Sequence, residues 1–532
     1  MSGDPDYIII GAGSAGCVLA NRLSGPAGGQ VLLLEAGGGS RGLRFRVPLL
    51  ATRLWSDPQC TWSLFSEPEP GVNGRRIPVP RGRALGGSSA INGTVFNRGV
   101  PADYDHWRDV GLEGWDYASL LPHFRRIEHH WRGTDALHGV DGEVPVTPLS
   151  ERSPLSPYVL EAAQQMGFPI TEDFIGPQAE GIGVCDLNVD RNGRRVSAAD
   201  SFLWPIRARR SLTVHTQAQV LRVLVENHRA VGVEYLRDGR LCIARAQREV
   251  ILSGGAIASP QLLLLSGIGP ADALTSHGIA VVHDSPEVGA NFNDQPGASF
   301  EIRSKLPLTL VRDLRIDRFA LNAARWVIGL GGPLAGPPIV AAGAVRTLST
   351  LARPDLRLNV AAATMQSKLW CPGFGTPPAH RLLFSFAVAH PASRGSITLA
   401  SDDPRQAPLI RFNLLAEQSD LEDLRRYYRL LRELVSQPAL ACVAGELTRP
   451  AREPATNEEL DAYLRSVAMT TSHPMGSCRM GADDRAVVDR ECRVRGVAGL
   501  RVVDASVFPS QISGNPHATA MMVGDRIGSA ML

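Results

Sequence analysis

The chain has 532 residues, of which 44% are hydrophobic and 20% charged, and its net charge is +2, so it exceeds a single compact core and two or three domains are expected. The charge is spread along the chain, and the short arginine cluster at 207–210 is typical of a solvated surface, which argues against a nucleic-acid partner. The eight cysteines are scattered without a C-x-x-C pair, which argues against a disulfide scaffold and against a structural metal site.

The N-terminal segment has the pattern of a dinucleotide-binding unit. An apolar strand at 6–10 runs into a G-x-G-x-x-G turn, a helix is predicted over 17–23, and a second apolar strand at 31–34 ends at Glu35. Such a turn lets the backbone approach a pyrophosphate, which the free N–H groups of the helix then hold. The glycines of the turn are Gly11, Gly13 and Gly16.

Glu35 narrows the choice of dinucleotide. Its carboxylate can accept hydrogen bonds from both ribose hydroxyls and would repel a 2′-phosphate, so NADP is disfavoured. A glycine-rich turn on its own is often only a turn, but here strand, helix, second strand and acid are all present. The motif alone leaves NAD and FAD open.

Residues 36–80 are predicted to be irregular, and a second distinctive stretch follows at 81–94. Its many small residues allow the backbone to lie close to a large flat ligand, and its hydroxyls and Asn92 offer hydrogen bonds. A plain flexible loop is the alternative, but Leu85 and Ile91 favour a packed one.

This stretch resembles the first signature of the glucose–methanol–choline (GMC) oxidoreductases, through Gly82-Arg83, Leu85-Gly86-Gly87-Ser88-Ser89 and Ile91-Asn92. Residues 255–269, which read Gly-Ala-x-x-Ser-Pro-Gln-Leu-Leu-Leu-Leu-Ser-Gly-Ile-Gly, resemble the second signature. The likeness runs from Asp6 to the C-terminus. It implies FAD as the cofactor.

The resemblance also implies a fold and a division into domains. The expected class is α/β, with a Rossmann-like FAD-binding domain, whose parallel sheet is flanked by helices, and an α+β substrate domain built on an antiparallel sheet. The FAD-binding domain would take residues 1–150, 196–300 and 456–532, and the substrate domain 151–195 and 301–455.

The FAD contacts that the resemblance implies lie in several segments. Some members attach FAD covalently through a histidine immediately before the loop asparagine, but this chain has Ile91 there, so we expect non-covalent FAD. A strand-capping role competes with the cofactor role assigned to Asp504. The implied contacts are Gly11, Gly13, Ser14, Ala15, Gly16, Glu35, Ala36, Arg83, Gly86, Gly87, Ser88, Asn92, Gly93, Thr94, Val95, Val220, Asp504, Ala505, His517, Ala518 and Thr519.

Other elements are predicted from hydrophobic patterning along the rest of the chain. A helix is expected over 117–131, and the adjacent pair His129 and His130 on it is interpreted as surface histidines, since helical neighbours point about 100° apart. A second helix is expected over 417–435. The predicted strands are 212–216, 231–235, 248–252, 395–399, 408–413 and 500–506.

Two C-terminal histidines carry the predicted chemistry. Oxidising an alcohol by hydride transfer to flavin needs a base near the hydroxyl, and histidine suits this at working pH. His473, in Ser-His-Pro-Met-Gly, and His517, in Asn-Pro-His-Ala-Thr, resemble the catalytic pair of the family. We assign His473 as the base, and His517 as the group that orients the substrate oxygen and stabilises alkoxide charge.

The substrate is less constrained. Residues placed near the site favour a small aromatic or allylic primary alcohol, although core packing explains them equally well; they are Trp62, Met365, Trp370 and Met475. A site for a quaternary amine requires an acidic residue beside an aromatic cage. No such acidic residue can be placed from the sequence. The departure at Gln295, where many members have histidine, has no functional interpretation.

Several alternatives stay open. A cyanohydrin lyase on the same scaffold is the main one; a non-catalytic FAD protein and a light-driven decarboxylase are more remote. The sequence leaves open whether O₂ or another electron acceptor reoxidises the flavin. It also leaves the oligomeric state open. With no leader before the first strand and no run of about 18 apolar residues, a cytoplasmic protein without a membrane span is expected.

Overall fold

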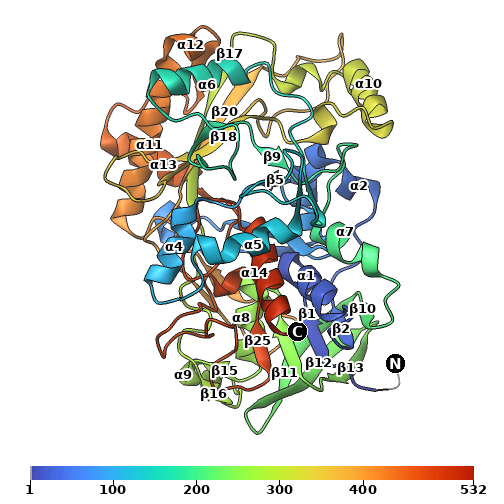
Figure 1. The fold of residues 1–532 in the computed structure, drawn as a ribbon. Coiled ribbons are helices and arrows are strands. Elements are labelled where there is room, and N and C mark those ends of the chain that lie inside the picture. The colour runs from blue at the N-terminus through green and yellow to red at the C-terminus, as the bar shows by residue number, and fades with distance from the viewer. Residues whose placement is uncertain (1–2) are drawn as a thin grey trace.

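The computed structural model describes residues 3–532 (Figure 1). Its elongated body holds a parallel sheet with α1 (Ser14–Leu23) and α8 (Gly255–Leu265) at one end. An antiparallel sheet with α6 (Ser156–Gln165), α10 (Ile316–Val327) and α12 (Pro438–Ala441) lies at the other end. The predicted α/β class, with one parallel and one antiparallel sheet, is confirmed.

The parallel sheet is assembled from segments far apart in the sequence. Its strand order is β10-β2-β1-β14-β25, and in its register Ile9 pairs with Leu33 on one side and Ile251 on the other. All residues of the first two strands are buried, as expected for continuous apolar strands covered on both faces. The strands are β1 (Tyr7–Ile10), β2 (Val31–Leu34), β10 (Leu212–His215), β14 (Glu249–Leu252) and β25 (Leu500–Val502).

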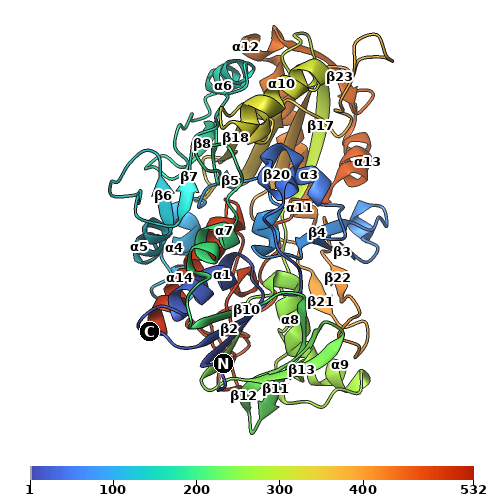
Figure 2. The same cartoon turned by 90° about the vertical axis from the view of Figure 1, so that its right-hand side faces the viewer.

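The first and last long helices pack against each other beside this sheet. Figure 2 shows α1 next to α14 (Pro516–Ala530). A Cβ added at Gly524 would lie 2.8 Å from the carbonyl oxygen of Ala15, so the two backbones approach as closely as glycine allows. The C-terminal helix thereby covers the helix that follows the dinucleotide turn.

The antiparallel sheet has the order β23-β17-β20-β19-β18-β8, with β24 beside β17. Its core includes stacked Phe300 and Phe384, with α11 (Gln418–Ser436) and α13 (Asn457–Val467) packed alongside. The strands are β8 (Gly181–Gly183), β17 (Pro296–Ser304), β18 (Ile339–Val345), β19 (Leu356–Ala361), β20 (Arg381–Val388), β23 (Ala444–Arg449) and β24 (Met469–Thr470).

We propose that the two sheets mark the two domains, with the limits expected from the sequence. β17 and β24 lie partly or wholly in segments assigned to the FAD-binding domain, so the proposed boundary passes through the antiparallel sheet. Among residues 3–532, no helix combines the length and the apolar character needed to cross a membrane.

Shorter elements connect the two ends of the molecule. The helix predicted over 117–131 ends at Ile127, because Glu128 begins a strand, and the strand predicted over 500–506 ends at Val502. The remaining elements are α2 (Leu43–Arg46), α3 (Ala51–Leu54), β3 (Thr61–Phe65), β4 (Pro78–Gly82), β5 (Val95–Phe96), α4 (Pro101–Asp109), α5 (Tyr117–Ile127), β6 (Glu128–His130), β7 (Val144–Val146), β9 (Asp186–Leu187), α7 (Ala198–Phe202), β11 (Ala218–Glu226), β12 (Arg229–Arg237), β13 (Arg240–Arg245), β15 (Ile268–Gly269), α9 (Ala271–Ser276), β16 (His283–Asp284), β21 (Ser396–Thr398) and β22 (Leu409–Arg411).

Candidate active site

The glycines of the N-terminal turn are required by its geometry. Gly11 has a φ of +99°, and a Cβ there would lie 2.5 Å from the carbonyl oxygen of Ser253. A Cβ on Gly16 would lie 2.0 Å from the carbonyl oxygen of Gly11, so α1 could not pack against the turn. Gly13 precedes Ser14, the first residue of α1. The free N–H groups at the N-terminus of a helix in this position can hold an anion.

Glu35 is buried at the end of β2, beside the turn. Its Oε2 accepts a hydrogen bond from the N–H of Ala12 at 2.9 Å, and its Oε1 accepts one from the N–H of Gly37 at 2.8 Å. Burial raises the pKa of this carboxyl to about 7, although the two N–H groups oppose the shift. The structure therefore places Glu35, predicted to bind a ribose, and the following Ala36 next to the glycine turn.

The loop after β4 lies directly on this turn. Gly87 has a φ of +53°, a Cβ there would lie 2.8 Å from the Cα of Gly13, and the N–H of Gly86 donates to the carbonyl of Ala12 at 2.7 Å. Asn92 Oδ1 accepts from the N–H of Thr94 at 3.0 Å and so shapes the loop before Val95. The two segments form one surface, although they are some seventy residues apart in the sequence.

The donor set around this surface fits a large polar cofactor. The Nε of Arg83, the hydroxyl of Thr94 and the hydroxyl of Ser40 are buried without a protein hydrogen-bond partner, and such atoms are costly unless a ligand satisfies them. A Cβ added at Gly93 would meet no atom within 4 Å, so the backbone there faces open space. Both observations suit the flat, hydrogen-bonding body of a flavin dinucleotide.

The remaining predicted cofactor residues differ in whether their polar groups already have hydrogen-bond partners in the protein and in how exposed they are. Asp504 Oδ2 accepts from the N–H of Gly255 at 2.8 Å and from the hydroxyl of Ser259 at 2.6 Å, so its carboxylate joins the end of β25 to the start of α8. The hydroxyl of Thr519 is bonded to Tyr104 at 2.7 Å. Ala15, Val220 and Ala518 are buried, Ala505 is half-buried, and Ser88 is exposed.

His473 lies in a cluster of polar side chains. Its Nδ1 is 2.6 Å from Arg357 Nη1, 3.1 Å from Gln295 Oε1 and 3.1 Å from Thr471 Oγ1. Burial, together with the charges of Arg357 and Arg81, lowers the pKa of His473 well below its ordinary value. The imidazole is therefore neutral at neutral pH, as a base must be.

His517 lies at the start of α14, directly before Ala518. Its Nδ1 is 2.8 Å from the hydroxyl of Ser14, the first residue of α1. Burial and the charge of Arg195 lower the pKa of His517 to about 4. The second predicted catalytic histidine is thus neutral as well and is held against the dinucleotide turn.

Arg357 links the two histidine-bearing segments and was not predicted from the sequence. It lies on β19, and besides His473 it donates to the side-chain oxygens of Gln295 and Asn515, two residues before His517. Gln295 was also missed as a site residue, although the sequence marked it as a departure from the family pattern. No local signal distinguishes Arg357 from the other arginines of the chain.

A cavity of about 90 Å³ adjoins this cluster. It lies between the end of the loop that follows β4, the antiparallel sheet and the segment before His517. Residues lining it include Val95, Asn97, Phe174, Arg357, Ser513 and Asn515.

None of the four predicted substrate-lining residues lines this cavity. Met365 is 86% exposed, and the indole N–H of Trp370 donates to the carbonyl of Val311 at 2.8 Å. The ring of Trp62 packs under the guanidinium of Arg83, and Met475 is fully buried in the core. The positions of these residues give no support to an aromatic substrate pocket.

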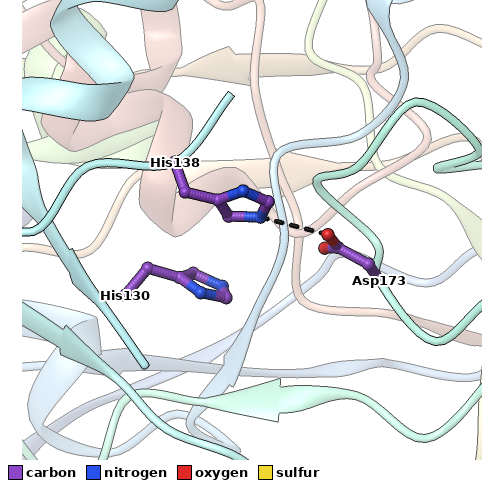
Figure 3. A group of neighbouring side chains, drawn as sticks. All are labelled: His130, His138 and Asp173. Atoms are coloured by element: carbon purple, nitrogen blue, oxygen red, sulfur yellow. Dashed lines mark ion pairs between the residues drawn. The ribbon is translucent and has the colours of Figure 1, made fainter. Parts of the chain in front are cut away.

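The prediction that His130 is a surface histidine is wrong. It is 2% exposed on β6, beside His138 and Asp173 (Figure 3), whereas the neighbouring His129 is exposed. His138 Nε2 lies 3.1 Å from Asp173 Oδ2, and its Nδ1 contacts Asp135 at 2.9 Å. The backbone N–H of Arg132 donates to His130 Nδ1 at 3.2 Å, which places the ring proton on Nε2, 3.6 Å from Asp186 Oδ2.

Family models and curated relatives match the chain over most of its length. Two family models described as GMC oxidoreductase match residues 5–297 and 391–524. The chain is 41% identical over 533 residues to the oxygen-dependent choline dehydrogenase of Pseudomonas putida, covering 99% of this chain and 94% of the relative. It is 38% identical over 531 residues to the enzyme of that name from Photobacterium profundum, covering 99% and 93% of the two chains.

Solved structures show the same fold. The crystal structure of pyridoxine 4-oxidase from Mesorbium loti superimposes with a TM-score of 0.88 at 29% identity, over 99% of this chain and 98% of the other. A formate oxidase of Aspergillus oryzae superimposes with a TM-score of 0.90 at 25% identity, also over 99% and 98%. These enzymes share the arrangement of parallel and antiparallel sheets found here.

Proposed function

Because the chain belongs to the GMC oxidoreductase family, we propose that it oxidises a small primary alcohol to the aldehyde at the site around His473. The family makes it an FAD-dependent alcohol oxidoreductase that acts on CH–OH donors. The observation that carries the finer proposal is the neutral, depressed-pKa imidazole of His473, surrounded by polar groups next to a cavity.

His473 is proposed to take the hydroxyl proton. Its Nδ1 is surrounded by Arg357, Gln295 and Thr471, which leaves Nε2 as the nitrogen for the substrate. Bound FAD would supply the acceptor for the hydride of the carbinol carbon. His517 would bond the substrate oxygen through the nitrogen that Ser14 does not contact and would stabilise developing alkoxide charge.

The cofactor is proposed to be held without a covalent bond. The turn from Gly11 to Gly16 would bind its pyrophosphate and Glu35 its ribose, while the loop carrying Arg83 and Thr94 would satisfy its polar edges. Ile91, at the place where some members attach FAD, is buried and has no nucleophilic atom. Acid precipitation of the yellow holoenzyme is therefore expected to release all FAD into the supernatant; flavin absorbance retained in the pellet would overturn the proposal.

Anaerobic bleaching tests the function itself. Alcohols are mixed with the holoenzyme without oxygen, and flavin absorbance is followed; oxygen is then readmitted and peroxide is assayed. Bleaching supports alcohol oxidation, and a cyanohydrin lyase would leave the flavin oxidised while releasing cyanide. Peroxide formation separates O₂ from another acceptor. The names of the relatives favour an oxidoreductase over a lyase.

The rate of flavin reduction is expected to stay constant as the pH falls past 6.5, the ordinary pKa of histidine. A histidine acts as a base only when neutral, and the depressed pKa of His473 keeps it neutral below that pH. Protonation would also destabilise the fold, so the His473 contribution to stability is lost as the pH falls below 6.5. Stopped-flow reduction across the acid range measures this, and a loss centred at or above 6.5 would contradict it.

A further inference from the structure

Arg357 is a half-buried cation whose guanidinium makes no direct contact with a carboxylate. It projects from β19, and its hydrogen-bond partners are the imidazole of His473 and the amide oxygens of Gln295 and Asn515, all of them neutral. Within residues 3–532, no carboxylate oxygen lies within 4.0 Å of its guanidinium nitrogens. A guanidinium removed from water in this way is costly unless an anion joins it.

The carboxylates closest to the site are already engaged. Asp294 accepts hydrogen bonds from Thr470 and from the N–H groups of Gln295 and His473. Asp103 accepts from the N–H groups of Val100 and Ser513 at 3.0 and 2.8 Å, and it lies 3.3 Å from His390. Burial lowers the pKa of Arg357 to about 10, and the charges of Asp294 and Asp103 oppose the shift. Neither acid contacts the guanidinium, so an anion in direct contact with it has to come from a ligand.

We infer that Arg357 binds the carboxylate of the substrate, and that the enzyme oxidises a short hydroxycarboxylate. The inference rests on the proposed alcohol oxidation and names the substrate class of the same site. Arg357 lines the cavity and also touches His473, so a carboxylate on the guanidinium places the hydroxyl-bearing carbon of a small molecule beside the base. Planar guanidinium groups recognise carboxylates with two parallel hydrogen bonds.

The same geometry disfavours choline, the substrate that the names of the curated relatives give. A quaternary ammonium is recognised by an aromatic cage, and an acid strengthens that site. Here the cavity that Arg357 lines has one aromatic lining residue, Phe174, and the guanidinium itself. A cationic substrate would lie next to the positive charge of Arg357 and be repelled.

Arg357 also controls which nitrogen of His473 carries the proton. A guanidinium only donates, so its contact with Nδ1 requires a lone pair there and puts the ring proton on Nε2. Gln295 Oε1 is an acceptor, because Nε2 of that amide donates to the carbonyls of Ala389 and Ile512; its contact with Nδ1 of His473 requires the proton there instead. The two contacts exclude each other.

A carboxylate that draws Arg357 away favours the contact with Gln295, in which Nε2 of His473 has a free lone pair. The hydroxyl proton then passes to Nε2 as the carbon–oxygen double bond forms, and bound FAD would accept the hydrogen of the carbinol carbon together with its bonding electron pair. The products are an oxocarboxylate, a protonated His473 and a flavin reduced by two electrons. Substrate recognition and activation of the base are thus one event.

Binding of an unreactive acid tests the recognition directly. α-Hydroxyisobutyrate has no hydrogen on its carbinol carbon and cannot be oxidised, and α-hydroxyisobutyramide is its neutral counterpart. Titration calorimetry with the holoenzyme is expected to show the acid binding about 100-fold more tightly than the amide, which corresponds to about 2.7 kcal/mol. Arg357→Gln is expected to remove this preference, and Arg357→Lys to keep part of it.

The matched control is Arg346→Gln. Arg346 is an exposed arginine just after β18 that pairs with Glu180 at 2.9 Å, and its replacement is expected to leave the preference intact. Equal affinity for acid and amide in the native enzyme would overturn the inference, as would a preference that survives in Arg357→Gln. If Arg357→Gln fails to retain FAD, the native enzyme and Arg357→Lys decide the outcome.

Anaerobic flavin reduction separates the two levels of the proposal. Glycolate, β-hydroxypropionate and γ-hydroxybutyrate are compared with ethylene glycol, propanol and choline. Faster bleaching by one of the acids supports the inference. If a neutral alcohol or choline bleaches the flavin fastest, the inference fails while the proposed alcohol oxidation stands. If none of the six reduces the flavin, both fail for these small substrates.

Discussion

Replacing His473 with alanine is expected to leave FAD bound and to slow flavin reduction by about 10²–10⁴-fold. The imidazole of His473 makes no contact with the turn from Gly11 to Gly16, which is proposed to bind the phosphates, so the cofactor content should not change. Without the base, the hydroxyl proton has no acceptor as the hydride leaves, because the nearby Arg357 and Arg81 are cations and Asp294 is occupied by its own hydrogen bonds.

Anaerobic stopped-flow absorbance measures the rate, and the flavin-to-protein ratio measures cofactor content. His129→Ala is a matched control, since this exposed histidine on β6 lies away from the site and its loss should change neither quantity. A His473→Ala enzyme that reduces its flavin at close to the native rate would show that another group is the base. His517, 2.8 Å from Ser14, would then be the next residue to replace.

The second large effect is expected from Gly16→Ala. The added methyl carbon would lie 2.0 Å from the carbonyl oxygen of Gly11 and 3.2 Å from the Cβ of Ser253, so the turn and α1 cannot keep their present positions. Backbone atoms cannot yield as a flexible side chain does, and we expect a loss of about 4 kcal/mol or more in the free energy of unfolding, together with loss of FAD.

Denaturant unfolding and flavin content measure the two effects. Gly42→Ala is the control, because a Cβ at that position would meet only Phe45, at 3.9 Å, and its φ of −62° suits alanine. Normal FAD content and an unchanged unfolding midpoint in Gly16→Ala would show that the turn relaxes more easily than its packing implies.

Local sequence patterns predicted the parallel sheet well because its strands are short apolar runs next to glycine turns. The strand at 31–34 and the start of α8 at Gly255 fall where the patterns place them. Ends were harder to predict: the helix beginning at Tyr117 stops at Ile127 because Glu128 pairs with Val144 in another strand. Pairing between distant segments decides such limits, and periodicity does not reveal it.

Site residues that lie in a local sequence motif could be predicted. Site residues that the fold brings together from distant segments could not. His473 and His517 lie in recognisable segments, whereas Arg357 reads as one charged residue in an alternating strand. Its importance comes from the register of β19 with β18 and β20, which carries its side chain to His473 and Asn515. Gln295 lies between these cases: the sequence marked the substitution, and only the structure gives it partners.

The strand order of the parallel sheet also determines how late in translation this sheet can be completed. β1 is complete after ten residues, but its neighbour β14 begins at Glu249 and the edge strand β25 at Leu500. The helix that covers α1 begins later still, at Pro516. The ribosome must therefore release the chain as far as α14 before the parallel sheet and its covering helix can assemble, and until then the early apolar strands lack their partners. Because such distant contacts form slowly, we expect chaperones to stay bound longest to the part of the chain that forms the parallel sheet.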